Sequence, residues 1–314
     1  MTGKIYKSTG SWYVVKTPDG RFWNSRLKGL FKLDEITSTN PLAVGDNVDL
    51  EAESGEEGTA VISAIHERNN YINRQSPSHR MQHHIVAANI DQSLLIATLT
   101  EPRTSQGFVD RFLVTCEAYH VPAVLLVNKT DLYRAKEQEK LAEWRKMYSA
   151  IGYRLIPMSV KTGEGLQEVA ALLTGKISLL SGHSGVGKSS FLNAAFPAMK
   201  LKTQEVSGWS GKGTHTTTFA EMFDLPADAE GKPRGQVIDT PGMREFGLVD
   251  ISKAELSGYF PEMRVFAGGC RFNNCLHVEE PGCVVKEAVR AGRIAEDRYV
   301  SYCHILDSIG DGHY

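Results

Sequence analysis

The sequence predicts a multidomain α/β protein with a small β-barrel at its N-terminus, a doubly wound sheet in the middle and a mostly α-helical unit at its C-terminus. Three observations lead to this prediction. Short alternating strands fill the first part of the chain, and fully apolar strands then alternate with helices, which is typical of a parallel sheet covered on both faces. Cysteines cluster in the last part. We expect domains at residues 1–68, 69–255 and 256–314.

The first domain is predicted to be an OB-fold β-barrel. The alternating stretches "SWYVV", "RFWNSR", "DNVDLEA" and "GTAVISAI" indicate short strands, and none has a helical period. Trp12, Phe22 and Trp23 lie among Lys16 and Arg21. OB-folds bind RNA with aromatic and basic side chains of this kind, but the same residues also suit a barrel core beneath solvated cations. The sequence leaves both interpretations open.

The second domain alternates predicted strands with predicted helices. The expected strand–helix pairs are, in order, "DQSLLIATL" with "VDRFLVTCEAYH", "VPAVLLVN" with "EQEKLAEWRKMYSAIG", "RLIPMS" with "GLQEVAALLTG", and "ISLLSG" with "GKSSFLNAAF". Two further strands are expected to pair near residues 217–225 and 235–239. In the third domain, "VKEAVRAG" and "AEDRYVSYCHILDSI" are expected to be helices.

Composition restricts the classes of function. The 314 residues are 41% hydrophobic and 23% charged, as in an ordinary folded protein, and the formal net charge is −2. Contact with nucleic acid must therefore come from local basic patches. No apolar run approaches the roughly 18–20 residues of a membrane span, and the start of the chain lacks signal-peptide features. We expect a cytoplasmic, monomeric protein without membrane contact.

A phosphate-binding loop is predicted by "GHSGVGKS", which matches the pattern G-x-x-x-x-G-K-[ST] between a predicted strand and a predicted helix. Backbone N–H groups of such a loop converge on phosphates at the helix N-terminus. Lys188 is expected to neutralise phosphate charge, and Ser189 to bind Mg²⁺. The alternative is a glycine turn before an ordinary helix. The predicted residues of the loop are Gly182, His183, Ser184, Gly185, Val186, Gly187, Lys188, Ser189 and Ser190.

A guanine-reading loop is predicted by "NKTD" at the end of an apolar strand. The Asp131 carboxylate can accept from both N1–H and the 2-amino group of guanine, and adenine offers neither donor. Asn128 is expected to brace the loop, and Lys129 to pack along the base. The next strand ends in "MSVKTG", whose backbone would face guanine O6. The predicted base-binding residues are Asn128, Lys129, Thr130, Asp131, Ser159, Val160 and Lys161.

Two segments later in the chain fit the switch regions of a nucleotide hydrolase. "VIDTPGMREFG" places Asp239 at a strand end, to reach Mg²⁺ through water, and Gly242 three residues later, to meet the γ-phosphate. "SGWSGKGTHTTTF" supplies threonines at 216–218, of which one, taken here as Thr217, is expected to reach Mg²⁺.

These motifs form the usual GTPase set in rotated order, with the base loop before the phosphate loop. A chain whose old termini are joined and which is opened elsewhere forms the same site, so we predict a circularly permuted P-loop GTPase. Met243 stands where Ras-like sites carry a water-orienting glutamine. His215 is therefore our candidate for orienting the water, and His183 is the runner-up. Lys188 is the other predicted catalytic residue. The alternative is that His215 is a structural loop histidine.

The cysteine cluster predicts a closed metal site. Cys270, Cys275, His277 and Cys283 provide three thiolates and one imidazole, which suit one structural Zn²⁺. The alternative is a set of reduced structural cysteines, because the spacing differs from that of common zinc fingers.

The chain resembles the ribosome small-subunit-dependent GTPase A family, a group of circularly permuted bacterial GTPases. The resemblance rests on the barrel, the series "NKTD…GHSGVGKSS…GTHTTT…DTPG" and the tail "CRFNNCLHVEEPGC". It implies an OB-fold, a permuted GTPase domain and a zinc-binding domain. It also implies slow GTP hydrolysis that the 30S subunit stimulates during late maturation, with contact to rRNA. The alternatives are an RNA-binding assembly module that uses GTP only as an occupancy ligand, and a GTPase that acts on another RNA.

Overall fold

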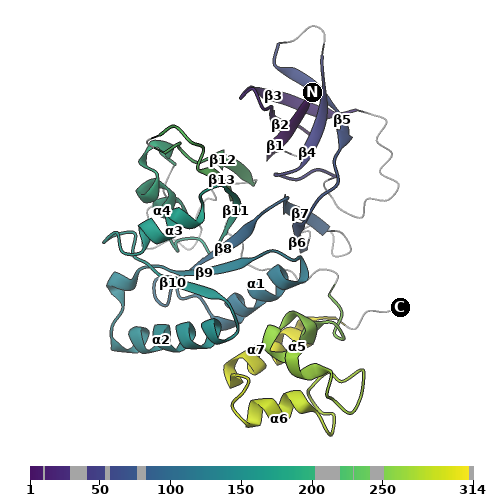
Figure 1. Cartoon of the computed structure of the whole chain (residues 1–314), viewed down its shortest axis with the longest axis vertical. Coiled ribbons are helices and arrows are strands. Elements are labelled where there is room, and N and C mark those ends of the chain that lie inside the picture. The colour runs from purple at the N-terminus through teal and green to yellow at the C-terminus, as the bar shows by residue number, and fades with distance from the viewer. Residues whose placement is uncertain are drawn as a thin grey trace, which may run out of the picture.

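The chain forms three units in a row, a barrel, a central sheet with helices and a small helical unit (Figure 1). The computed structural model describes residues 1–9, 11–28, 41–53, 57–75, 83–201, 220–228, 230–240 and 251–310. In Figure 1 the barrel and the C-terminal helical unit lie at opposite ends of the molecule. The predicted fold class is confirmed, and the predicted domain bounds stay predictions.

Five strands close the N-terminal barrel in the order β1-β2-β3-β5-β4, with β4 pairing back onto β1. The pairs are antiparallel except for β3 with β5. The barrel core includes Ile5, Val15, Val48 and Ile62, all fully buried. The strands are β1 Thr2–Ser8, β2 Tyr13–Lys16, β3 Phe22–Leu27, β4 Asn47–Ala52 and β5 Thr59–Ile65.

The central sheet has the strand order β10-β9-β8-β11-β13-β12, and only β12 is antiparallel to its neighbour β13. Its strands are β8 Gln92–Ala97, β9 Ala123–Val127, β10 Arg154–Pro157, β11 Lys176–Ser181, β12 Glu221–Asp224 and β13 Gly235–Asp239. The helices are α1 Gln106–Ala118, α2 Ala135–Ala150, α3 Leu166–Leu172 and α4 Lys188–Ala195, with 3₁₀ turns at Thr130–Leu132 and Pro197–Met199.

Helices cover the parallel strands on both faces, which is why these strands are apolar throughout. Leu95, Leu125 and Leu155 pack under α1 and α2, whereas the alternate residues, such as Leu94 and Leu126, pack under α3 and α4. Parallel strands place their carboxyl ends at one edge of the sheet. The loops that follow β9, β10, β11 and β13 therefore meet there.

The barrel and the central sheet share hydrogen-bonded strands, an arrangement that the sequence did not indicate. β1 pairs with β12 at Lys7 and Glu221, so that one sheet of 11 strands runs through both units. Ile5 faces the barrel core while its neighbour Tyr6 faces the central core, so both are buried. Two buried residues in succession hide the alternation that identifies a strand. A hairpin of β6 Tyr71–Gln75 and β7 His83–Ala88 connects the units.

The C-terminal unit packs against α1 of the central unit. Val114 of α1 lies in the same apolar cluster as Phe260 and Tyr302. The elements of the unit are a 3₁₀ turn at Leu256–Tyr259, α5 Pro261–Ala267, α6 Val284–Arg290 and α7 Glu296–Ser308. Within the described ranges, the helices are too short or too polar to cross a membrane.

A buried ionic cluster fastens this unit to the central unit. Arg298 of α7 lies 2.7 Å from Asp110 of α1 and 2.7 Å from Glu262 of α5, and all three side chains are at most 5% exposed. Tyr148 of α2 donates to the same Asp110 oxygen at 2.7 Å. The guanidinium also lies over the Phe260 ring at 4.5 Å. Removal of the guanidinium would leave two carboxylates buried without a cation.

We expect Arg298→Leu to lower the free energy of unfolding by about 3–5 kcal/mol, because breaking a buried ion pair leaves uncompensated charge. Urea unfolding followed by tryptophan fluorescence measures the change. Arg264→Leu is the control, since Arg264 is 58% exposed and pairs with Glu117 at 3.3 Å; its cost is below about 1 kcal/mol. Equal costs for the two variants would contradict a structural role for the buried cluster.

Candidate functional site

The predicted nucleotide-binding loops meet at the carboxyl edge of the central sheet. The base loop follows β9, its rim follows β10, the phosphate loop joins β11 to α4, and Asp239 ends β13. Open parallel sheets bind ligands at this edge. The loops come from segments far apart in the chain.

The phosphate loop is a tight turn that only glycine permits at two positions. Gly182 has φ +142°, and a Cβ there would lie 2.4 Å from the Ile96 carbonyl oxygen. Gly187 has φ +101°, and its Cβ would lie 2.5 Å from the Asn128 amide nitrogen. Both contacts are far shorter than a real Cβ tolerates. The glycine pattern is therefore required by the fit of the loop against β8 and the base loop.

Lys188 begins α4 and turns back over the loop. Its ammonium donates to the carbonyl oxygens of Gly182 at 2.8 Å and His183 at 3.1 Å. Burial lowers the pKa of Lys188, and the charge of Asp239 opposes this effect. Ser189 and Ser190 follow in the first turn of α4, Val186 is fully buried, and Ser184 and Gly185 are exposed. The loop thus holds a cation at the start of a helix, where anions bind.

Asn128 ties the base loop to the phosphate loop and to the rim. It is 2% exposed. Its side-chain amide donates to the Val186 carbonyl oxygen at 2.8 Å, and its Oδ1 accepts the Val160 N–H at 3.2 Å. The Tyr133 hydroxyl donates to the Asn128 carbonyl oxygen at 2.7 Å and accepts the Leu99 N–H at 2.9 Å. One side chain therefore joins three of the predicted motifs.

Asp131 and Ser159 lie against each other. The Ser159 hydroxyl donates to Asp131 Oδ1 at 2.6 Å, and the Lys161 ammonium lies 3.8 Å from Asp131 Oδ2. Thr130 donates from its hydroxyl to Glu164 at 2.7 Å. Lys129 has left-handed backbone with φ +67° and donates to the Glu101 carbonyl oxygen. The sequence predicted a backbone rim at 159–161, but it did not predict that the Ser159 side chain holds the carboxylate.

Asp239 carries a carboxylate oxygen that has no hydrogen-bond partner among the described residues. The side chain is 8% exposed, and the orphaned atom is Oδ1. Burial raises its pKa to about 6, against the nearby Lys188 charge. Thr240 beside it is anchored, since its hydroxyl donates to the Leu180 carbonyl oxygen at 3.2 Å. An orphaned buried carboxylate next to a phosphate loop fits the donor set of a hydrated Mg²⁺.

Three predicted site residues lie outside the described residues, namely His215, Thr217 and Gly242. Their roles stay predictions. His183, the runner-up for water positioning, stacks on Phe108 of α1 with ring centroids 3.8 Å apart. Burial, followed by the Lys188 charge, lowers the pKa of His183, so its imidazole is neutral at pH 7. Phe108 was not predicted at the site, because an apolar residue on a helix normally indicates core.

The four predicted metal ligands converge in the C-terminal unit. The ligand atoms of Cys270, Cys275, His277 and Cys283 all lie within 4.8 Å of one another. His277 Nδ1 lies 3.6 Å from the Cys270 sulfur and 3.4 Å from the Cys283 sulfur, and these sulfurs are 4.0 Å apart. A tetrahedron with zinc–sulfur bonds of about 2.3 Å has edges of about 3.6–3.8 Å. The donor set and its spacing therefore fit Zn²⁺.

Hydrogen bonds to the backbone hold the ligand loop in place. The Tyr302 hydroxyl donates to the Leu276 carbonyl oxygen at 2.7 Å, and the Tyr299 hydroxyl donates to the His277 carbonyl oxygen at 2.7 Å. Glu280 accepts the Leu276 N–H at 2.7 Å. Both tyrosines belong to α7, which also carries Arg298. Helix α7 thus connects the four predicted metal ligands to the ionic cluster of Arg298, which fastens the C-terminal unit to the central unit.

The barrel aromatics divide between core and surface. Tyr13 is 2% exposed and Trp23 packs against the barrel core, whereas Trp12 and Phe22 are 47% and 53% exposed. Lys16 lies 5.5 Å from the Phe22 ring centroid. The barrel therefore exposes two aromatic side chains, whereas Lys16 beside them pairs with Asp224 at 2.5 Å.

Two family models match this chain. The model of the family described as RsgA GTPase matches residues 65–249, and that of the RsgA N-terminal domain matches residues 2–60. A relative from Christiangramia forsetii named "Small ribosomal subunit biogenesis GTPase RsgA" is 48% identical over 314 residues, which cover 100% of this chain and 98% of the relative.

Two solved structures are similar over nearly the whole chain. The crystal structure of YjeQ from Thermotoga maritima has a TM-score of 0.76 and 34% identity, and the match covers 99% of each chain. The structure of YloQ, described as a circularly permuted GTPase, has a TM-score of 0.71 and 28% identity, covering 100% of this chain and 96% of that one.

The Mg²⁺-dependent gain in GDP affinity should increase as pH rises through about 6, because only the ionised Asp239 carboxylate binds a cation. Titration of labelled GDP with and without Mg²⁺ at several pH values measures this gain. Asp239→Asn is the control. This variant lacks the carboxylate, so any remaining pH dependence comes from the phosphates of GDP. A pH profile identical in the two proteins would contradict the assignment of Asp239.

Removal of bound zinc should unfold the C-terminal unit, because structural zinc contributes its binding energy to folding. Metal analysis before and after chelation, together with thermal melting, measures the effect. Cys275→Ser should lose the metal, whereas Cys303→Ser, which lies on α7 outside the cluster, should retain it. Unchanged melting after verified loss of zinc would exclude a structural metal.

Proposed function

This chain belongs to the RsgA GTPase family, and we propose that it hydrolyses GTP in the biogenesis of the small ribosomal subunit. The single observation that supports this most is the Asn128 amide, which joins the base loop, its rim and the phosphate loop into one site. The alternative in which GTP is only an occupancy ligand is not favoured, because the family is one of GTP-hydrolysing enzymes.

The base site selects guanine through Asp131. Its carboxylate accepts from N1–H and from the 2-amino group, and the Ser159 hydroxyl at 2.6 Å fixes its orientation. Asn128 holds the loop, and Lys129 packs along the base. Adenine in this site would leave the carboxylate without donors, at a cost of about 1–3 kcal/mol for each unmade hydrogen bond.

The phosphate site holds the reacting end of GTP. The N–H groups of residues 182–190 surround the phosphates, and Lys188 leaves its carbonyl partners to bind the β- and γ-phosphates. Ser189 and Thr217 would hold Mg²⁺, and Asp239 would reach it through water. When bound, Mg²⁺ neutralises charge on the phosphate oxygens. Zinc in the Cys270–Cys283 cluster would have a structural role, since three thiolates and one imidazole supply a closed set of four ligands.

Hydrolysis requires a water in line with the γ-phosphate, and this chain lacks a glutamine to orient it. Met243 occupies that position and is a poor hydrogen-bonding group. His215 orients the water, and Gly242 donates its N–H to the γ-phosphate. We expect turnover to be slow until a partner stimulates it.

The partner is the small ribosomal subunit, as in the names of the relatives. The barrel exposes Trp12 and Phe22. It lies at the opposite end of the central unit from the C-terminal unit, so both end units can contact rRNA at once (Figure 1). The protein acts as a monomer in the cytoplasm, where the subunit matures. Action on another RNA has no comparable support.

Multiple-turnover release of phosphate from GTP, measured with and without 30S subunits, tests this function. We expect slow release alone and strong stimulation by 30S subunits, whereas equal rates with 50S subunits or transfer RNA would contradict the choice of partner. His215→Ala should abolish stimulation while GDP still binds.

Asp131→Asn is the specificity control for the same assay. An asparagine amide donates to the 2-oxo group of xanthine, so stimulated hydrolysis should shift from GTP toward XTP by about tenfold or more. If the variant keeps its preference for GTP, Asp131 does not read the base.

A further inference from the structure

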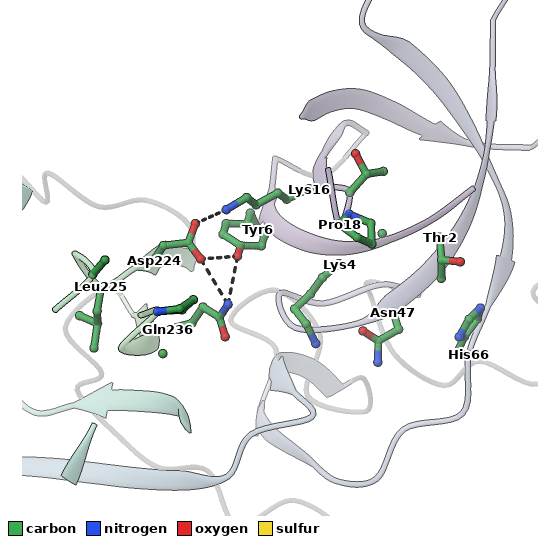
Figure 2. Close-up of a pocket in the computed structure, with 15 residues that line it drawn as sticks. Thr2, Lys4, Tyr6, Lys16, Pro18, Asn47, His66, Asp224, Leu225 and Gln236 are labelled. Carbon is green, nitrogen blue, oxygen red and sulfur yellow. Dashed lines mark hydrogen bonds and ion pairs between the residues drawn. The ribbon is translucent and has the colours of Figure 1, made fainter. Parts of the chain in front are cut away.

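A cavity of about 600 Å³ lies where the barrel meets β12 and β13 (Figure 2). The barrel supplies Lys4, Asn47 and His66 to its lining, and the central unit supplies Leu225 and Gln236. The volume is in the range of small-molecule sites. No predicted GTP-binding residue belongs to this lining, so the cavity is separate from the nucleotide site described above.

One corner of the cavity carries a cation without a direct partner. The Lys4 ammonium is half-buried and makes no hydrogen bond or ion pair with any described residue. Burial lowers the pKa of Lys4, although the charges of Asp91 and Asp46 oppose this effect. Asp46 already accepts Arg68 at 2.7 Å on both of its oxygens, and Asp91 accepts the Ile177 N–H at 2.7 Å. An anion entering the cavity is the partner that this cation lacks.

Polar donors stand beside this cation. The Asn47 side-chain amide has no partner among the described residues. Figure 2 shows the Lys4 and Asn47 side chains pointing the same way, with His66 next to Asn47. The His66 Nε2 is paired with Asp49 at 3.0 Å, which leaves its other ring nitrogen for a ligand. The corner can therefore surround an anion with an ammonium, an amide and an imidazole.

The opposite corner has a different chemistry. Asp224 accepts Lys16 at 2.5 Å and the Tyr6 hydroxyl at 2.7 Å, and Gln236 donates to Asp224 at 3.2 Å (Figure 2). This network cancels the Lys16 charge and leaves Gln236 Oε1 as an acceptor. Leu225 forms an apolar wall beside it, and Pro18 lies across the cavity on the barrel side (Figure 2). A flat, apolar group with a polar edge fits this corner.

We propose that this cavity binds a nucleoside monophosphate unit, with the phosphate at Lys4 and Asn47, the base on the apolar wall, and the base edge at Gln236. The unit is either a free nucleotide or one nucleotide of an RNA strand. The combination of one unpaired cation, an apolar wall and an acceptor matches this ligand class better than inorganic phosphate, which would leave the wall uncovered. The inference does not depend on the proposed hydrolysis.

A ligand in this cavity would contact the hairpin that connects the predicted switch threonines to Asp239. β12 follows directly after the switch threonines, and β13 ends at Asp239. A ligand that contacts both the barrel and this hairpin stabilises one arrangement of the two.

Titration of the full-length protein, loaded with GDP and Mg²⁺, with UMP tests the proposal by NMR or calorimetry. GDP binding is measured first, so that failure of the guanine site is recognised separately. UMP is used because uracil does not match Asp131. We expect saturable binding at millimolar UMP and about tenfold weaker binding of uridine, which lacks the phosphate. No saturable UMP binding, or equal binding of uridine, overturns the proposal.

Two variants locate the ligand. Lys4→Met should weaken UMP binding about tenfold, whereas Lys28→Met, which removes an equal charge that pairs with Glu51 outside the cavity, should leave it unchanged. Ala227 is an exposed residue of the central unit that lines the cavity, so Ala227→Trp should fill the cavity and abolish UMP binding. UMP binding that survives both Lys4→Met and Ala227→Trp overturns the proposal.

A short oligouridylate without terminal phosphates distinguishes the two sources. If it displaces UMP and its binding needs Lys4, the site takes a nucleotide within an RNA strand. If only UMP binds, the site takes a free nucleotide. Either result supports the shared chemistry.

Discussion

The geometry of the nucleotide site depends on one buried amide, that of Asn128. The side chain donates to the phosphate loop at Val186 and accepts from the rim at Val160. These loops follow three different strands of a parallel sheet. A backbone hydrogen bond from the Thr130 N–H to the Met158 carbonyl oxygen at 3.3 Å links the base loop to its rim, and the Asn128 amide adds the phosphate loop. The tight backbone of Gly187 exists because the amide occupies the space that a side chain would need. Without this residue the Ser159–Asp131 hydrogen bond would still join the base loop to its rim, but the phosphate loop would lose its hydrogen bond to the Asn128 amide.

Permutation of the chain decides how this site is connected to the rest of the molecule. The hairpin β12–β13 follows the predicted switch threonines in the chain and ends at Asp239, and β12 pairs with β1 of the barrel. On the other side, Phe108 of α1 stacks on His183, and Asp110 of α1 pairs with Arg298 of the C-terminal unit. The phosphate loop is therefore connected physically to both flanking units.

Much of the fold and site could be predicted from sequence because the responsible residues are local. Glycines, a lysine and a serine at fixed spacing specify the phosphate loop, and apolar runs specify buried parallel strands. The β1–β12 pairing could not be predicted, because Ile5 and Tyr6 are both buried in different cores and hide the alternation. The ionic cluster of Arg298 was missed for a related reason. A charged residue on a helix normally indicates a solvated face, and its partners on α1 and α5 are distant in the chain.

The most direct test of this account is the GDP affinity of Asn128→Ala, measured by fluorescence titration beside the unaltered protein. Loss of the amide leaves the Val186 carbonyl and the Val160 N–H without their partner, at about 1–3 kcal/mol each. The account predicts a loss of GDP affinity of at least about tenfold, whereas the melting temperature of the C-terminal unit should stay unchanged. GDP affinity equal to that of the unaltered protein would contradict the central role of Asn128.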